Sequence, residues 1–395
     1  MRQAKHQGWT RALGRILLVG IMAASMVLPA HAGPREQARV IHDRLAGIPP
    51  TDAVLTQMEN LIAGNDAIGA ANVAMQDPSF YNVTLKNFAA PWTNRDQSVF
   101  VPLNDYIATV IGMIRDNVPF NTLLSADLTY HVPGFAPAVS ANNNLHYEEL
   151  ERNNVNLFAA LEPTSQSSVM SIPATATAGV MTSRAASEAF FIAGTNRAMF
   201  RFTLLNHMCN DMEQVHDTKL PPDRIRQDVS RSPGGDSRLF LNNCIGCHNG
   251  MDPMAQAFAY YNYVPVDETT GRLEYTGGVV QDKYFNNDLN FPQGFRTPDD
   301  AWENRWREGQ NAYLGFSPSL SGSGNGAKSL GEELANSEAF ASCQVRKVFR
   351  TVCMRDPEDQ PDRDMVGQLT TDFMNALGYR MKDVFAETAV YCMGQ

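Results

Sequence analysis

The run CIGCH at residues 244–248 constrains this chain most, because it places two thiols and an imidazole within about one helical turn. Residues three and four positions apart on a helix share a face, so Cys244, Cys247 and His248 can point to the same side. This spacing is typical of a c-type haem site, in which the thiols bond the haem and the histidine ligates its iron. The motif therefore predicts one covalent haem c, with His248 as the proximal iron ligand.

Two other kinds of site use a CxxC spacing, namely a redox disulfide and half of a zinc site. Zinc would need further ligands, but no second CxxC or HxxxH pair follows, and the chain has no histidine after His248. A thioredoxin-like site would follow a strand in a βαβ unit, and the flanking sequence lacks that pattern. The surroundings of the motif favour haem.

The first 32 residues have the pattern of a secretory signal peptide. Four basic residues precede an apolar run over residues 16–28, and Ala30-His31-Ala32 has the small residues of a cleavage site. The apolar run is shorter than the roughly 20 residues of a membrane-spanning helix. We expect the leader to be removed, leaving a periplasmic or secreted bacterial protein with no integral membrane segment.

The four cysteines outside the motif are expected to form two disulfides, because an even remainder in an exported chain is typical of such bonds. They are Cys209, Cys343, Cys353 and Cys392. Ten residues of straight helix would separate Cys343 from Cys353 by about 15 Å, beyond the roughly 7 Å between Cα atoms that a disulfide can bridge. Cys392 should therefore pair with one of these two and Cys209 with the other.

The apolar residues recur with a helical period through much of the chain, which predicts a mainly α fold. Residues 33–135 are expected to form a helical N-terminal domain, with amphipathic helices within residues 50–64 and 103–117. Residues 136–184 are rich in Ala, Ser, Thr, Pro and Asn and predict an irregular connecting region. Residues 185–395 are expected to form the haem domain, with long irregular loops and a C-terminal helical module.

Within the haem domain the pattern predicts one helix over about 185–210, another over 252–263, and a short helix starting at Pro298. The second would carry Tyr260, Tyr261 and Tyr263 as candidates to pack at the haem edge. The third would place Trp302 and Trp306 on one face, for ordinary packing or for contact with a haem propionate. Candidate propionate partners are also Arg224, Arg226, Arg231 and Arg305, although the first three equally fit a solvated basic loop.

The sixth iron ligand is left open by the sequence. Neither methionine nor histidine occurs between Met254 and Met354, so a distal methionine some tens of residues after the motif is lacking. Met251 and Met254 follow His248 too closely to reach the opposite haem face easily. The remaining candidates are His207, Met208, Met212 and His216 upstream, and Met354, Met365, Met374, Met381 and Met393 downstream.

Three blocks resemble the planctomycete-type cytochrome c proteins, whose modules mostly carry domain-of-unknown-function labels. These blocks are CIGCHNGMDPMAQAFAYY, SLGEELANSEAFASCQVRKVFR, and RLAGIPPTDAVL together with MIRDNVPFNTLLSADLTY. The chain departs from the group's pattern at Ala255 and Ala259, near positions where the group has glycine and glutamate. The resemblance implies one covalent haem on a mostly helical scaffold, in proteins that often accompany machinery for degrading complex external substrates.

The chain is acidic, with 42 Asp and Glu against 32 Lys and Arg and a net charge of −10. Such a surface repels nucleic acid and anionic membranes, and it suits a basic redox partner or simply keeps the protein in solution. Together these features predict an exported monohaem cytochrome c that transfers electrons to or from a redox protein. The alternatives are a haem enzyme of peroxidase or oxygenase type with an open distal site, and a partner-docking protein with structural haem.

Overall fold

The computed structural model describes residues 32–191, 194–267, 269–284 and 293–394. The expected leader lies outside these residues except for Ala32. The fold is mainly α, as the sequence predicts. The helices are α2 (Pro34–Ala46), α3 (Asp52–Ala63), α4 (Ala67–Ala74), α5 (Lys86–Ala89), α6 (Asp105–Arg115), α7 (Leu145–Arg152), α8 (Leu157–Ala160), α9 (Gln166–Met170), α10 (Arg184–Phe190), α11 (Arg197–Met208), α12 (Ser237–Leu239), α13 (Ile245–Ala255), α14 (Gly326–Ala335), α15 (Glu338–Cys353), α16 (Gln360–Asn375) and α17 (Met381–Tyr391).

The strands in the described residues are short and form three antiparallel pairs. These are β1 (Thr129–His131) with β2 (Glu162–Thr164), β3 (Tyr261–Pro265) with β4 (Gly271–Tyr275), and β5 (Ala301–Glu303) with β6 (Ser323–Asn325). Each pair stays a two-stranded sheet and does not extend into a larger one.

The two helices expected near the N-terminus are both present. Thr51 caps α3 by accepting a hydrogen bond from the Val54 amide at 3.4 Å, and Gly64 follows the helix end. Asn104 caps α6 in the same way, accepting from the Ile107 amide at 3.0 Å. Helix α6 is buried all round from Asp105 to Ile114, whereas its sequence suggested a single apolar face. The reason is that α5, α10, β1 and α17 all pack around it.

Three expected helices differ in the structure. Residues 185–210 form two helices, α10 and α11, because Gly194 and Asn196 before the second helix have positive φ angles of 58° and 60°. Residues 252–263 do not form one helix. Helix α13, which contains most of the motif, ends at Ala255, and strand β3 begins at Tyr261. Alternate residues of β3 are buried. The segment with Trp302 is strand β5, held by its pairing with β6.

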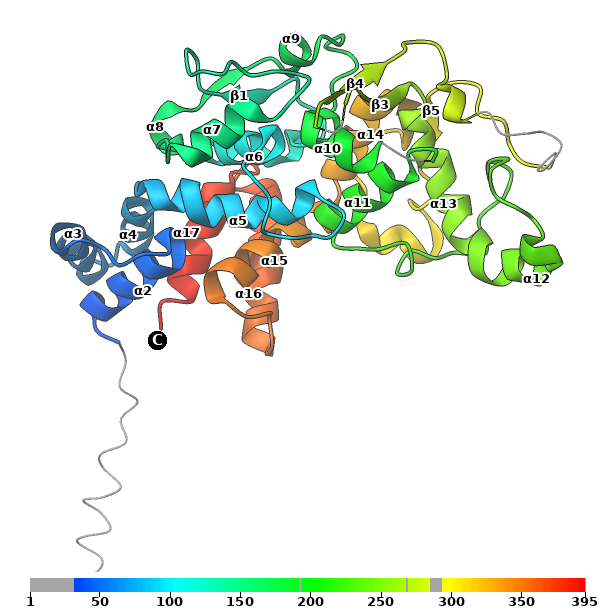
Figure 1. Cartoon of the computed structure of the whole chain (residues 1–395). Coiled ribbons are helices and arrows are strands. Elements are labelled where there is room, and N and C mark those ends of the chain that lie inside the picture. The colour runs from blue at the N-terminus through cyan, green and yellow to red at the C-terminus, as the bar shows by residue number, and fades with distance from the viewer. Residues whose placement is uncertain (1–31, 192–193, 268, 285–292, 395) are drawn as a thin grey trace, which may run out of the picture.

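One hydrophobic core runs through most of the molecule, from Ala38 to Ala389. The C-terminal helices α15 and α17 pack against α2, and α15 also packs against α11. Figure 1 shows α2–α4 on one side of the molecule and α12 and α13 on the other. Residues 136–184 carry α7, α8, α9 and β2, so this region has regular elements of its own. The division of the chain into domains stays a prediction.

The expected disulfide pairing is confirmed. Cys209 pairs with Cys343 at a Cα–Cα distance of 5.3 Å, and Cys353 pairs with Cys392 at 5.6 Å. The first bond joins the end of α11 to α15, and the second joins α15 to the end of α17. None of the described helices is both long and apolar enough to cross a membrane.

Candidate haem site

The CIGCH motif lies where a π-helical turn (Phe240–Cys244) passes into α13. The run begins at α12, which Asp236 caps by accepting a hydrogen bond from the Arg238 amide at 2.9 Å. Two side chains just before the motif, Leu239 and Leu241, are 44% and 54% exposed. The motif thus occupies the first turn of a helix whose entry is open to solvent.

One face of α13 is docked tightly onto the rest of the protein. A Cβ atom built on Gly246 would lie 2.2 Å from His216 Nε2, and one built on Gly250 would lie 2.2 Å from Trp306 Nε1. Between them, Asn249 Nδ2 donates to two carbonyl oxygens of the 217–220 loop, at 2.8 and 2.9 Å. Only glycine leaves room for these close approaches, so the sequence of the motif also fixes how its helix packs.

Cys244 ends the π-helical turn, Cys247 and His248 lie in the first turn of α13, and all three are partly exposed. All six cysteines lie in the described part of the chain, and Cys244 and Cys247 are the two that are unpaired. Burial, with smaller contributions from nearby acidic charges, raises the pKa of the Cys247 thiol.

His248 has a defined partner for one of its two ring nitrogens. Its Nδ1 donates to the Asp252 carboxylate, with Nδ1 3.2 Å from Oδ1 and 3.3 Å from Oδ2. Metal-binding histidines commonly donate one ring N–H to a carboxylate, which fixes the ring and leaves the other nitrogen free to ligate. In His248 the nitrogen left for a metal is Nε2.

Asp252 is fully buried and is held by Arg197, which donates from Nε to Oδ1 at 2.7 Å and from Nη2 to Oδ2 at 2.8 Å. Arg197 also pairs with Asp228 through Nη2 at 2.7 Å. Burial alone would raise the pKa of Asp252. The pKa is nevertheless well below its usual range, because Arg197 and Arg226 carry positive charges nearby and because Arg197 and His248 donate hydrogen bonds to the carboxylate. Asp252 is therefore an anion with a fixed orientation.

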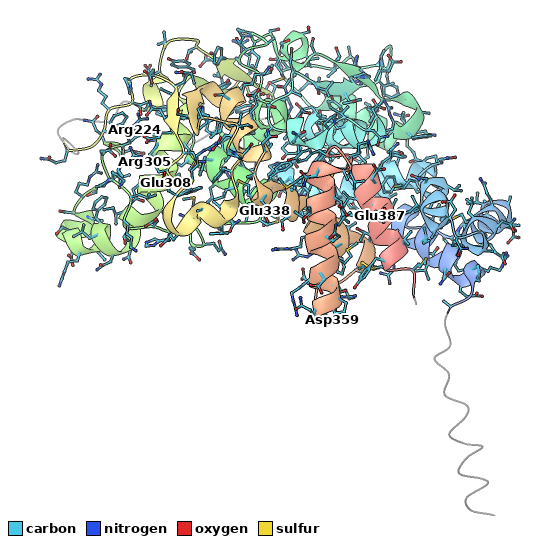
Figure 2. The ribbon with its side chains drawn as sticks, turned by 180° about the vertical axis from the view of Figure 1, so that it is seen from behind. Arg224, Arg305, Glu308, Glu338, Asp359 and Glu387 are labelled. Carbon is cyan, nitrogen blue, oxygen red and sulfur yellow. A yellow bond between two sulfur atoms is a disulfide. The ribbon has the colours of Figure 1, made fainter. Side chains whose placement is uncertain are left out.

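The arginines considered for haem propionates have other partners. Arg226 is 2% exposed, lies 3.8 Å from Asp252 Oδ1 and sits over the Tyr284 ring. Arg224 and Arg305 lie close together (Figure 2), and both pair with Glu303, at 3.9 and 3.1 Å.

The other residues expected at the haem edge bond to or pack against protein groups. Arg231 donates to backbone carbonyls of its own loop. Trp302 Nε1 donates to Ser329 Oγ at 2.8 Å, whereas Trp306 lies against Gly250. Tyr261 donates to the Ala176 carbonyl at 2.6 Å, Tyr263 donates to Glu188 at 3.4 Å, and Tyr260 packs in a small separate core.

Among the upstream distal candidates, His207 and Met208 are buried at the end of α11. His207 Nε2 is 2.6 Å from the Tyr106 hydroxyl, and its ring packs edge-on to Trp92. Burial, with a smaller contribution from the charge of Lys347, lowers the pKa of His207 well below its ordinary value. Both side chains are buried, and Met208 is part of the main hydrophobic core.

The remaining candidates lie beside the motif or far from it. The Met212 carbonyl accepts a hydrogen bond from Cys247 Sγ at 3.5 Å, and the Met212 side chain is buried. His216 packs against Gly246, on the docked face of α13. Met354 follows the last residue of α15 and is 74% exposed. The other downstream candidates lie in or next to α16 and α17: Met365, Met374, Met381 and Met393.

Arg197, Asp228 and Asp252 were not among the site residues predicted from the sequence. One signal for Asp252 was available, because a carboxylate four residues after a histidine shares its helix face. Arg197 stands 55 residues earlier in the chain, and no local pattern links it to the motif. The chain matches no protein-family model, no curated protein and no solved structure.

Proposed function

We propose that this protein is an exported monohaem c-type cytochrome that acts in electron transfer, of the planctomycete-type group that its sequence resembles. One observation carries the proposal: the two unpaired thiols, Cys244 and Cys247, stand three residues apart beside the anchored imidazole of His248, while the four other cysteines are paired. This donor set fits haem c, because the thiols are free to form thioethers and His248 Nε2 is free to ligate. The two disulfides and the leader pattern support export.

Bound haem would supply an iron that cycles between Fe(II) and Fe(III). Cys244 and Cys247 would hold the group covalently, and His248 would ligate through Nε2. Asp252 keeps the Nδ1 proton of His248 and presents a fixed negative charge behind the ring. The docked face of α13 keeps the motif from shifting, because Gly246 and Gly250 leave no space between the helix and its neighbours. The partly exposed motif suits exchange with a redox protein.

The proposal is tested by producing the full chain in bacteria that mature c-type cytochromes. The mature protein should be heavier than its sequence by one haem, should keep haem after denaturation, and should show the absorption bands of a reduced cytochrome c. An unmodified mass from cells that mature another c-type cytochrome in parallel would contradict the proposal.

A haem enzyme with an open distal site is the second candidate. It is favoured by the surroundings of three candidate distal ligands: His207 is bonded to Tyr106, Met208 is buried in the core, and His216 packs against Gly246. For an electron carrier we expect the sixth coordination position of the iron to be filled. Carbon monoxide should then bind little to the reduced protein, because that position is taken. A methionine ligand would also give a near-infrared charge-transfer band in the oxidised protein. Rapid, complete carbon monoxide binding without that band would decide for the enzyme.

A further inference from the structure

A groove of about 560 Å³ lies between α16 and α17, two helices that stand apart from α13 and the motif (Figure 1). We call it the acidic groove, because Asp372 and Glu387 line it and, in the described part of the chain, no Lys, Arg or His does. Its volume is within the roughly 300–1,000 Å³ of small-molecule sites.

The walls of the acidic groove are mostly apolar and reach the solvent. Met365 and Leu377 lie on the α16 side, and Val390 and Met393 lie on the α17 side, all of them partly exposed. Leu369, which is 5% exposed, joins these walls to the main core. Methionine side chains adapt their shape to an apolar ligand. An incoming hydrocarbon chain can therefore cover carbon surface that water otherwise contacts.

The two carboxylates of the acidic groove lack a positive partner within the residues that the structure describes. Asp372 accepts hydrogen bonds from the neutral Gln368 amide, with Nε2 3.1 Å from each carboxylate oxygen. Glu387 makes no hydrogen bond or ion pair there, whereas Asp383, on the same helix, pairs with Arg380 at 2.7 Å. Burial, with smaller contributions from the charges of Asp383 and Asp372, raises the pKa of Glu387. This environment favours a positive charge beside Glu387.

We propose that the acidic groove binds an aliphatic amine, with the ammonium group beside Asp372 and Glu387 and the alkyl chain along the apolar walls. An ammonium group has three donors, so it can bond to both carboxylates. Hydrogen bonds between charged groups are stronger than those between neutral groups. A simple inorganic cation would leave the apolar walls in contact with water, and an uncharged chain would leave both carboxylates unpaired. The proposal is independent of the haem.

The test uses three probes with the same alkyl chain, octylammonium, 1-octanol and octanoate, each titrated into the full mature protein at neutral pH and followed by calorimetry. We expect saturable 1:1 binding of octylammonium that weakens with added salt. 1-Octanol has the chain without the charge and should bind at least about tenfold more weakly. Octanoate should show no saturable binding, because its charge is repelled by Asp372 and Glu387.

Glu387→Gln should weaken octylammonium binding about tenfold, because it removes a hydrogen bond between charged groups. Asp372→Asn should act in the same direction. Met365→Ala should weaken binding about fourfold or more, since the shorter side chain offers the alkyl chain less apolar contact. Glu332→Gln is the matched control, because Glu332 is an exposed glutamate on α14 that makes no described ion pair. It should change the affinity less than about twofold.

Circular dichroism checks that each variant is folded, and sedimentation checks that the groove is not covered by a second copy of the chain. Three results would overturn the proposal. They are absence of saturable octylammonium binding, equal affinity for 1-octanol or octanoate, and unchanged octylammonium affinity in folded Glu387→Gln and Asp372→Asn. A dimer that covers the groove and prevents binding would overturn it as well.

Discussion

Replacing both motif cysteines, Cys244→Ser with Cys247→Ser, is expected to abolish covalent haem attachment completely. Serine cannot form the thioether, and the other four cysteines are held in disulfides and offer no replacement thiol. Each single replacement leaves one possible bond, so the amount of covalently bound haem should fall strongly without reaching zero. The measurement is the intact mass of the purified protein, together with haem staining after denaturation.

The control for this experiment is the double variant Cys353→Ser with Cys392→Ser. It also removes two cysteines, but from the disulfide between α15 and α17. We expect it to keep its haem and to lose stability, because a disulfide lowers the entropy of the unfolded chain. Equal loss of haem in the control and in the motif variant would mean that folding, and not the thiols at 244 and 247, limits attachment.

The replacement Asp252→Asn is expected to raise the reduction potential of the bound haem. The carboxylate of Asp252 accepts the Nδ1 proton of His248 and carries a full negative charge. This charge stabilises Fe(III) over Fe(II) because it makes His248 a stronger donor. An amide oxygen accepts the same hydrogen bond without the charge. We expect about a tenfold change in the electron-transfer equilibrium, about 59 mV for one electron, measured by spectroelectrochemical titration.

Two further variants separate the hydrogen bond from the general loss of negative charge. Asp228→Asn removes the other carboxylate on Arg197 and leaves the contact between His248 and Asp252 intact, so its effect on the potential should be much smaller. Asp252→Glu keeps the charge and should restore much of the original potential. Because Asp252 is buried and paired, thermal unfolding is measured for each variant. Equal shifts from Asp228→Asn and Asp252→Asn would contradict a specific role for Asp252.

Local signals in the sequence predicted the parts of the fold that depend on neighbouring residues. Helix α3 begins after Thr51 and ends before Gly64, as expected. The spacing of Cys343 and Cys353 correctly excluded a disulfide between them. The sequence failed where tertiary pairing decides the structure. Trp302 has a helical spacing to Trp306, but strand β5 forms because β6, some twenty residues later, pairs with it.

The candidate site shows the same division. The spacing of Cys244, Cys247 and His248 alone predicts them as site residues, since they lie within about one helical turn. The ion pairs behind His248 need Arg197 from another helix and Asp228 from a loop. Such partners are set by the packing of α11 on α13, which no short motif encodes.

The bond between Cys209 and Cys343 closes a loop of 134 residues that contains the whole CIGCH motif. If the chain is exported N-terminus first, as proposed, Cys209 would emerge before both motif cysteines, and Cys343 would emerge last of these four. An oxidase that joined cysteines in order of appearance would consume Cys244, and six cysteines allow 15 complete pairings. Export would thereby constrain the order of events: the motif thiols would have to stay reduced until Cys343 had left the cytoplasm, or a wrong bond would first have to be opened.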